Sequence, residues 1–382
     1  MFKLLKNGKI YSPQYMGVMD ILIAVGKIIK VQENITQDGL WDVETIDCTG
    51  KIVLPGIIDQ HLHIIGGGGE RGPASRIPEI FLTDIVNAGI TTVVGVLGFD
   101  GLTRSMAGLL AKARALEVEG VNTFIYTGSY GLPTTTLTGS VISDITFIDK
   151  VIGAGEIAIS DYRSSHPDTK ELKSLAYEVK IGSMISNKAG VLHIHVGDGK
   201  DGLKPLTDLL NDSEFPVEMF VPTHVNRNRK LFEQGLEHLK AGGNIDLTAG
   251  STGGMGYDVP DALSIIIESG KGLDRVTISS DANGSIPNSS GELGVGKVNM
   301  LIDDLKKSIL ERGLKIEDVF STVTLNVAQL LKLYPQKGIL ANGSDADILV
   351  MDEKELKIFE LMINGVSFVH EGKTIKKGSY EN

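Results

Sequence analysis

The chain has 382 residues, of which 42% are hydrophobic, and this is enough for one large core plus an accessory domain. Its 37 basic and 48 acidic residues give a net charge of −11, which argues against nucleic-acid and anionic-membrane partners. The N-terminal apolar stretch is too short for a signal peptide, and no run approaches the roughly 18 apolar residues of a membrane span. One cysteine, Cys48, precludes an internal disulfide. We therefore expect a cytoplasmic protein in which Cys48 is a small buried side chain.

Both ends of the chain predict short β-strands. Residues 1–53 alternate β-type runs with Gly, Asn and Asp turns and show no helical period, and the tail from residue 336 does the same. Neither end has enough strands for an independent sheet. We expect residues 1–53 plus 336–382 to form one small β-sandwich domain.

The region between them, residues 54–335, repeats a pattern of strand, loop and helix. Strand candidates are residues 52–60, 91–97, 123–127, 151–159, 191–196, 219–223, 245–248 and 276–279, and helical stretches such as 171–187 and 230–241 separate most of them. Eight such units predict an α/β protein with a TIM (β/α)8 barrel, whose active site lies at the carboxyl ends of the strands. A doubly wound open sheet is the alternative, but no Gly-x-Gly-x-x-Gly turn follows the first barrel strand.

A His-x-His motif ends the first predicted barrel strand. On a strand, residues two apart point to the same face, so His61 and His63 can direct two imidazoles at one cation while Leu62 packs on the other side. Alone, such a pair fits a core or surface role equally well. Further candidate ligands follow other apolar runs, and these are His193, His195, His224 and Asp281. Four strand ends thus carry residues that bind metals.

This order of ligands resembles the amidohydrolase superfamily, in which a split β domain flanks the barrel. The resemblance covers essentially the whole chain, including Asn-Val-Ala at 326–328 and Gly-Ser-Asp-Ala-Asp at 343–347. Within the superfamily, the chain is similar to the bacterial isoaspartyl dipeptidases, which cleave β-aspartyl dipeptides. The more specific motifs are Gly-Gly-Gly-Gly-Glu at 66–70 and Thr-His-Val-Asn-Arg-Asn at 223–228.

The resemblance implies two Zn²⁺ ions per subunit, bridged by an anionic side chain and a hydroxide. The implied ligands are His61, His63 and Asp281 for one zinc, and His195 and His224 for the other. Many relatives bridge the ions with a carbamylated lysine, but the matching position here is Glu156, provided that one residue is inserted among the nearby glycines. Because glutamate already carries a negative charge, this bridge needs no bicarbonate. The alternative is that Glu156 is an ordinary charged residue. We expect His193, deeper in its strand, to support a ligand or to pack in the core.

The resemblance also implies roles in catalysis and substrate binding. Asp281 would be the general base and later the proton donor to the leaving amine, and Tyr130 would stabilise the oxyanion. The implied substrate-binding residues are Gly68, Glu70, Arg163, Arg227 and Ser285. Glu70 suits the substrate ammonium, and the arginines suit carboxylates. Phe99 stands where a small polar residue is expected, which leaves fine specificity open.

The predicted function is therefore metal-dependent hydrolysis of the β-aspartyl peptide bond in dipeptides. One alternative is a cyclic-amide hydrolase of the hydantoinase or dihydroorotase type, which shares the metals but has no evident need for Glu70 and two arginines. Another is a metal-free scaffold protein on the same fold. The resemblance further implies a homo-oligomer, such as an octamer.

Overall fold

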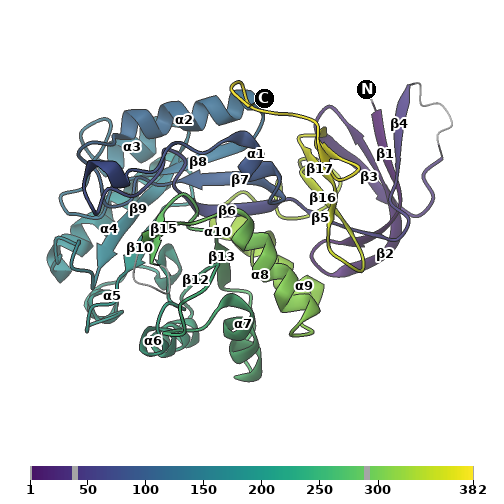
Figure 1. Cartoon of the computed structure of the whole chain (residues 1–382). Coiled ribbons are helices and arrows are strands. Elements are labelled where there is room, and N and C mark those ends of the chain that lie inside the picture. The colour runs from purple at the N-terminus through teal and green to yellow at the C-terminus, as the bar shows by residue number, and fades with distance from the viewer. Residues whose placement is uncertain (1, 37–41, 288–292, 382) are drawn as a thin grey trace.

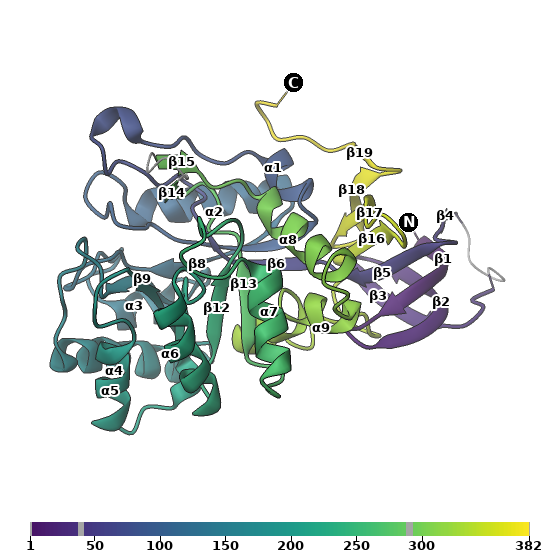
Figure 2. The same cartoon turned by 60° about the horizontal axis from the view of Figure 1, so that its bottom comes forward.

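The computed structural model describes residues 2–36, 42–287 and 293–381. They form a barrel of strands surrounded by helices, and beside it a sheet built from the first and last segments of the chain (Figure 1). The view in Figure 2 shows the purple N-terminal strands and the yellow C-terminal strands side by side at one flank of the barrel. Within the described residues, no helix is both long enough and apolar enough to cross a membrane.

Eight parallel strands make the barrel wall. In chain order they are β6 (Ile57–Leu62), β7 (Ile90–Gly95), β8 (Asn122–Thr127), β9 (Val151–Ile159), β10 (Val191–Val196), β11 (Phe220–Thr223), β12 (Ile245–Thr248) and β13 (Val276–Ser279). Strands β6 to β11 form one parallel sheet, and β12 pairs with β13. Two backbone bonds close the gaps, since Val225 N donates to Asp246 O (3.4 Å) and Asp281 N donates to His61 O (3.1 Å). The predicted (β/α)8 barrel is confirmed.

The first predicted strand is wrong in one respect. The run 52–60 is not one strand but two, β5 (Lys51–Pro55) and β6, with Gly56 between them. A Cβ atom on Gly56 would lie 2.3 Å from the side chain of Thr91, so only glycine fits this junction. The break allows β5 to join the end sheet while β6 enters the barrel. The other predicted barrel strands lie where the sequence pattern placed them.

Helices flank the barrel wall. They are α1 (Leu82–Val86), α2 (Met106–Glu119), α3 (Val141–Phe147), α4 (Thr169–Ser186), α5 (Lys204–Asn211), α6 (Arg229–Lys240), α7 (Val259–Glu268), α8 (Asn299–Leu310), α9 (Ile316–Ser321) and α10 (Leu325–Leu330), with 3₁₀ turns at Pro73–Ser75 and Val217–Met219. The longest, α4, starts at a capping box in which Asp168 Oδ1 accepts from Glu171 N (2.8 Å) and Glu171 Oε2 accepts from Asp168 N (3.0 Å). Helices α4 and α6 match the predicted ranges to within two residues.

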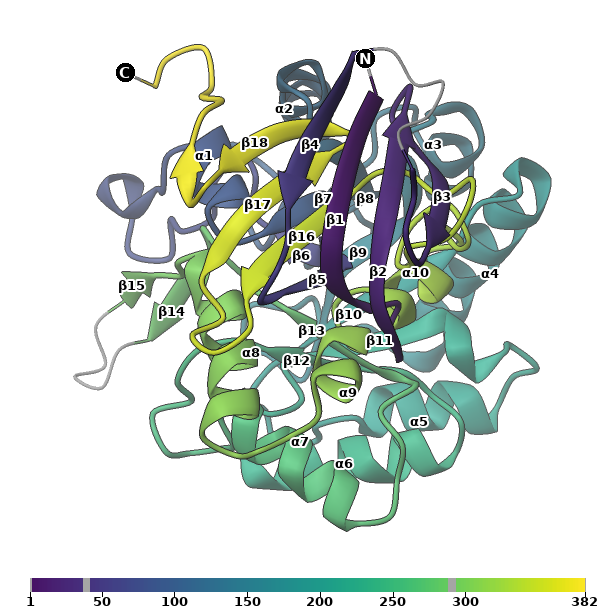
Figure 3. The same ribbon diagram turned by 90° about the vertical axis from the view of Figure 1, so that its right-hand side faces the viewer.

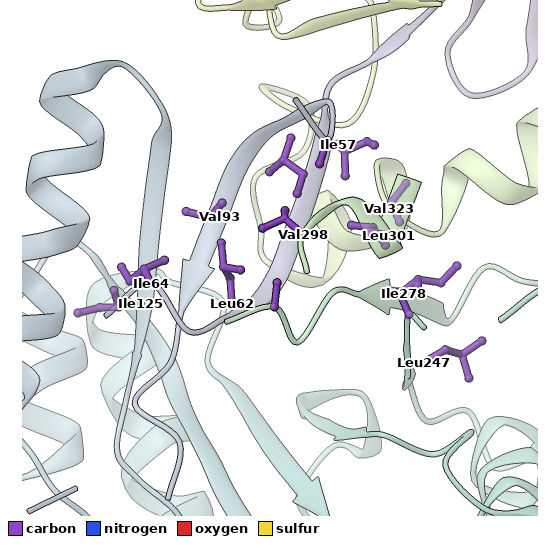
Figure 4. Packing of buried hydrophobic residues seen from close by; sticks show 14 of the residues in the cluster. Ile57, Leu62, Ile64, Val93, Ile125, Leu247, Ile278, Val298, Leu301 and Val323 are labelled. Carbon is purple, nitrogen blue, oxygen red and sulfur yellow. The ribbon is translucent and has the colours of Figure 1, made fainter. Parts of the chain in front are cut away.

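An apolar layer joins the barrel wall to the surrounding elements. Figure 4 shows Ile57 of β6 close to Leu301 of α8 and Val323. Leu62, which separates the two histidines of the His-x-His motif, is fully buried in the same cluster. The alternation of β6 therefore directs Leu62 into the core and the two imidazoles to the opposite side.

The end sheet combines nine strands from both ends of the chain (Figure 3). They are β1 (Phe2–Tyr11), β2 (Tyr15–Ala24), β3 (Lys27–Gln32), β4 (Val43–Asp47), β5, β16 (Ile348–Asp352), β17 (Ile358–Ile363), β18 (Val366–His370) and β19 (Lys373–Thr374). The order is β19-β18-β17-β16-β5-β1-β2-β3, and β4 also pairs with β1. Ile28 N donates to Ser344 O (2.9 Å), so the far end of the sheet returns to the segment that enters β16.

Strands from both ends enclose one core, as expected. It contains Leu5, Ile10, Ile21, Ile28, Ile46, Cys48, Val53, Leu340, Ile348, Val350 and Met362. Burial raises the pKa of the Cys48 thiol to about 12, in keeping with a packing role. We propose the division into 1–53 plus 336–382 and 54–335, although β5 continues the end sheet to Pro55. Residues 1, 37–41, 288–292 and 382 of these ranges lie outside the described residues.

Candidate active site

Six predicted metal ligands meet at the carboxyl ends of the barrel strands. His61 is in β6, His63 follows it, Glu156 is in β9, His195 is in β10, His224 follows β11 and Asp281 follows β13. The histidines and Glu156 are buried, and the Asp281 side chain is 17% exposed. The structure thus brings together residues that lie up to 220 positions apart in the chain.

Glu156 is shared between two groups of candidate ligands. The ligand atoms of His61, His63 and Glu156 lie within 4.8 Å of one another, as do those of Glu156, His195 and His224. Glu156 Oε1 is 2.7 Å from His195 Nδ1 and 3.2 Å from His224 Nε2, whereas Oε2 is 3.4 Å from His61 Nε2. Each carboxylate oxygen therefore faces a different group, which is the arrangement of a bridging ligand.

Asp281 belongs to the group on the β6 side. Its Oδ1 lies 3.2 Å from His63 Nε2 and 3.4 Å from His61 Nε2. The backbone bond from Asp281 N to His61 O fixes this side chain against the first strand. The placement agrees with the ligand set that the resemblance implies.

The donor atoms fit metal ions. His61 Nε2 and Glu156 Oε2 are buried and have no hydrogen-bond partner among the described residues, although they face each other. Burying such atoms unpaired is costly unless a cation joins them. Burial lowers the pKa of His61, but Glu156 and Asp281 together raise it to about 10, so the local field favours positive charge. Imidazole nitrogens and carboxylate oxygens are ligands that Zn²⁺ takes.

A β-bulge turns Glu156 into the site. Ala154 pairs with Leu192 and Ile157 with Ile194, so Gly155 and Glu156 together stand opposite the single residue His193. A Cβ atom on Gly155 would lie 2.7 Å from the Cβ of His193, and glycine is therefore required here.

Buried polar residues lie behind the ligands. A supporting role was one of the two expectations for His193, whereas Asp246 was not predicted. His61 Nδ1 lies 2.9 Å from His193 Nε2, which orients the His61 ring with Nε2 toward Glu156. Asp246, beneath this pair, accepts hydrogen bonds from Gln60 Nε2 (2.8 Å) and three hydroxyl groups, those of Thr223, Thr277 and Ser279. The available signal was a charged residue inside the apolar run Ile-Asp-Leu at 245–247.

Asp161 is a second functional residue that sequence reasoning missed. Its Oδ2 lies 3.0 Å from His195 Nε2 and accepts from Arg163 Nη2 at 2.9 Å. Burial raises the pKa of Asp161, but hydrogen bonds from His195 and Arg163 outweigh burial and hold it well below the usual range. Asp161 thus links a candidate metal ligand to a candidate substrate-binding arginine.

The predicted substrate-binding residues line the same cavity. Glu70 Oε1 lies 3.3 Å from Arg163 Nη1 and also accepts from Ser285 Oγ. Gly68 and Arg227 complete the wall, and Phe99 lies beside them. Arg227 Nη1 donates to the carbonyl of Val196 at 2.8 Å. The cavity therefore presents an ion pair, the Glu70 carboxylate and the Arg163 guanidinium, next to the candidate metal ligands.

Tyr130 also reaches the ligand cluster. Its hydroxyl lies 2.8 Å from His195 Nδ1 and 3.4 Å from Glu156 Oε1. Burial, aided by the charge of Glu156, raises the pKa of Tyr130 well above its usual value, so the phenol keeps its proton and can donate it in a hydrogen bond. The Arg163 guanidinium lies 5.2 Å from the centre of the Tyr130 ring.

Comparisons with known proteins agree with this geometry. The model of the amidohydrolase family matches residues 258–378. The crystal structure of β-aspartyl dipeptidase from Fervidobacterium islandicum AW-1 in complex with β-Asp-Leu is 45% identical in sequence, covers 98% of each chain and gives a TM-score of 0.92. The chain belongs to the β-aspartyl dipeptidase family. It is accordingly a hydrolase of the amidohydrolase superfamily.

Two further relatives are more distant in sequence. Dihydroorotase from Streptococcus pneumoniae is 25% identical over 403 residues, which cover 92% of this chain and 90% of that enzyme. Adenine deaminase from Clostridium perfringens is 22% identical over 391 residues. The chain spans about three fifths of the length of that deaminase, 61%.

Proposed function

We propose that this protein is a metal-dependent β-aspartyl dipeptidase, which hydrolyses the amide formed by the side-chain carboxyl of an aspartyl residue. The observation that carries the proposal is the Glu70–Arg163 pair in the cavity beside the ligand groups that share Glu156. The 45% identical β-aspartyl dipeptidase, whose crystal structure is a complex with the dipeptide β-Asp-Leu, supports it.

We propose that the protein holds two Zn²⁺ ions through the ligands already described, with Glu156 between them. Bound there, such ions would supply a nucleophile from water at neutral pH and polarise the scissile carbonyl. The protein's own contribution is to fix the ligand rings, to present Glu156 in the bulge of β9, and to keep the surroundings dry.

Asp281 and Tyr130 would assist the reaction. Burial raises the pKa of Asp281, but the charge of His61 and the hydrogen bond with His63 outweigh burial and hold it well below the usual range, so the carboxylate is ionised at neutral pH. It can accept a proton from the attacking water and pass it to the leaving amine. The Tyr130 hydroxyl would donate to the oxygen of the carbonyl as negative charge develops there.

The free α-groups of the aspartyl residue match the cavity. Its ammonium would pair with Glu70 and its α-carboxylate with Arg163. The 3.3 Å ion pair between Glu70 and Arg163 would thus be replaced by two ion pairs with the substrate. Arg227 would bind a carboxylate, with Gly68 and Ser285 completing the wall. An α-aspartyl dipeptide cannot present both groups in this way, which leaves buried charges unpaired.

The assay compares β-Asp-Leu with α-Asp-Leu. We expect hydrolysis of the β isomer only, lost on chelation and restored by Zn²⁺. Comparable turnover of the two isomers would contradict the specificity. Dihydroorotate and hydantoins serve as the alternative substrates, because the match to a 25% identical dihydroorotase covers 92% of this chain. Hydrolysis of these cyclic amides in place of β-Asp-Leu would favour the second function. Elemental analysis that finds no metal in active protein would contradict the proposed cofactor.

We further propose a cytoplasmic homo-oligomer, such as an octamer, with no nucleic-acid or membrane partner. The support is the family resemblance for assembly and the net charge of −11 for the excluded partners. Light scattering on the purified protein tests the assembly, and a monomer at micromolar concentration would contradict it.

A further inference from the structure

The segment 64–77, which we call the glycine loop, carries Glu70 over the cavity. Its two limbs are joined by backbone bonds, since Gly69 N donates to Ser75 O and Ile77 N donates to Gly67 O, each at 3.0 Å. The limbs approach closely, because a Cβ on Gly66 would lie 2.0 Å from Ile77 O. The limbs thus meet backbone to backbone, and hydrogen bonds help to hold the loop in place.

Arg104, which precedes α2, binds the glycine loop through three backbone carbonyls. Its guanidinium donates through Nη2 to Gly67 O (2.8 Å) and Ile77 O (3.0 Å), and through Nη1 to Ile65 O. One side chain thus binds carbonyls from both limbs. Arg104 is only 8% exposed, so these carbonyls would lose their donors, with little water to replace them, if the guanidinium were removed.

This buried cation lacks a carboxylate partner. Within the described residues Arg104 forms no ion pair, and the nearby Asp100 instead accepts from Arg76 at 3.1 Å. Burying a guanidinium without a carboxylate is expensive, and burial accordingly lowers the pKa of Arg104. What the buried guanidinium stabilises is the conformation of the glycine loop, which carries Glu70.

We propose that Arg104 is a positioning residue for recognition of the substrate α-ammonium. By fixing the glycine loop, it keeps Glu70 next to Arg163 and Ser285, so that the acid is in place before the substrate arrives. This inference rests on the proposed function, since it assigns Glu70 to the ammonium of a β-aspartyl dipeptide.

The test compares β-Asp-Leu with succinyl-Leu, which is the same molecule without the α-amino group. We expect the wild type to prefer β-Asp-Leu, and Arg104→Met to reduce this preference in kcat/KM by about tenfold or more, mainly through KM. The kcat and the metal content should change little. Arg76→Met is the matched control, because Arg76 lies in the same loop with its side chain 38% exposed, and it should keep the preference.

Two further measurements separate positioning from a general structural role. If Arg104 acts through Glu70, the losses caused by Arg104→Met and Glu70→Gln should not add in the double variant. Hydrogen exchange of the Gly69 and Ile77 amides should accelerate in Arg104→Met, whatever its activity. If that variant fails to fold, Arg104→Lys, which can serve fewer carbonyls, should show a partial loss of preference.

The outcomes distinguish the two proposals. Suppose that the wild type cleaves β-Asp-Leu. The role of Arg104 alone is then overturned if Arg104→Met keeps the preference for β-Asp-Leu over succinyl-Leu, if its loss adds to that of Glu70→Gln, or if hydrogen exchange of the Gly69 and Ile77 amides is unchanged. A wild type that does not cleave β-Asp-Leu would overturn the proposed function and, with it, the recognition of the ammonium.

Discussion

At the scale of single residues, Glu156 places a permanent negative charge among the candidate metal ligands. It is 1% exposed and surrounded by imidazoles, whose positive charge and hydrogen bonds outweigh the effect of burial and keep its pKa well below the usual value. A permanent carboxylate at this position would separate the two proposed cations without any added chemical group. Its removal should therefore affect metal binding before it affects folding.

We predict that Glu156→Ala lowers the metal content as well as the rate, because two dications would then face each other without a shared anion. Elemental analysis of the folded variant measures the metal, and circular dichroism provides the control for folding. The wild-type rate should not respond to added bicarbonate. Full metal occupancy in Glu156→Ala would contradict the bridging role.

We predict that Tyr130→Phe reduces kcat by roughly a hundredfold, with little change in KM or metal content. The substitution keeps the ring beside Arg163 and removes only the hydroxyl, which lies 2.8 Å from His195 Nδ1. Steady-state kinetics with β-Asp-Leu measure the effect. A variant that retains most of its kcat would assign Tyr130 to packing of its loop.

The sequence predicts the ligands better than their supports. His61 and His63 are recognisable because strand alternation places them on one face. Asp161 and Asp246 act through contacts with residues far away in the chain, such as His195 Nε2 at 3.0 Å and the amide of Gln60 at 2.8 Å. Local sequence patterns carry no information about such distant pairs, so these two carboxylates emerged only from the fold.

At the scale of elements, the bulge in β9 and the break at Gly56 show where pattern reading fails. The apolar run of β9 predicts its bounds, Val151–Ile159, but not the extra residue that turns Glu156 inward. The run through Gly56 stays apolar, because both β5 and β6 are buried, so periodicity alone does not reveal the boundary. In both places glycine is required because a residue of a neighbouring strand lies too close for a side chain.

We predict that Gly155→Ala destabilises the protein by about 1–3 kcal/mol and lowers its metal content, because the new methyl group would force β9 away from β10. The added Cβ would lie 2.7 Å from the Cβ of His193. Gly131→Ala is the control, since its nearest neighbour would be 4.0 Å away. Chemical denaturation measures both variants, and equal stabilities would contradict the role of the bulge.

At the scale of the whole molecule, a buried ion cluster ties the end sheet to the barrel. Lys337 Nζ lies 2.9 Å from Asp345 Oδ2 and 2.6 Å from Asp347 Oδ2. Asp347 in turn accepts from Asn122 Nδ2 of the barrel at 3.0 Å. Lys337 is 8% exposed, so its charge is compensated mainly by these two carboxylates.

We predict that Lys337→Met destabilises the protein by about 3 kcal/mol at pH 7, because the buried carboxylate of Asp347 loses its cation and the partly buried one of Asp345 keeps only Lys27. Burial raises the pKa of Asp345, but Lys337 and Lys27 outweigh burial and lower it from 3.8. A lowered pKa stabilises the fold above pH 3.8, and the gain is lost as the pH falls through the folded value.

The penalty of Lys337→Met should therefore shrink below about pH 4. Urea unfolding at several pH values measures it. Lys354→Met, at an exposed position, should change stability by less than about 0.5 kcal/mol. A penalty that is independent of pH would contradict the electrostatic cause.

The contact between β13 and β6 completes the candidate metal site only after the whole barrel has been synthesised. Asp281 N bonds to His61 O, and His63 N bonds to Ala282 O, so three ligands are assembled only when the last barrel strand reaches the first. A nascent chain that has not yet delivered β13 displays the histidine pair without its carboxylate. If the site binds metal as proposed, unfinished chains should therefore bind it more weakly than finished barrels.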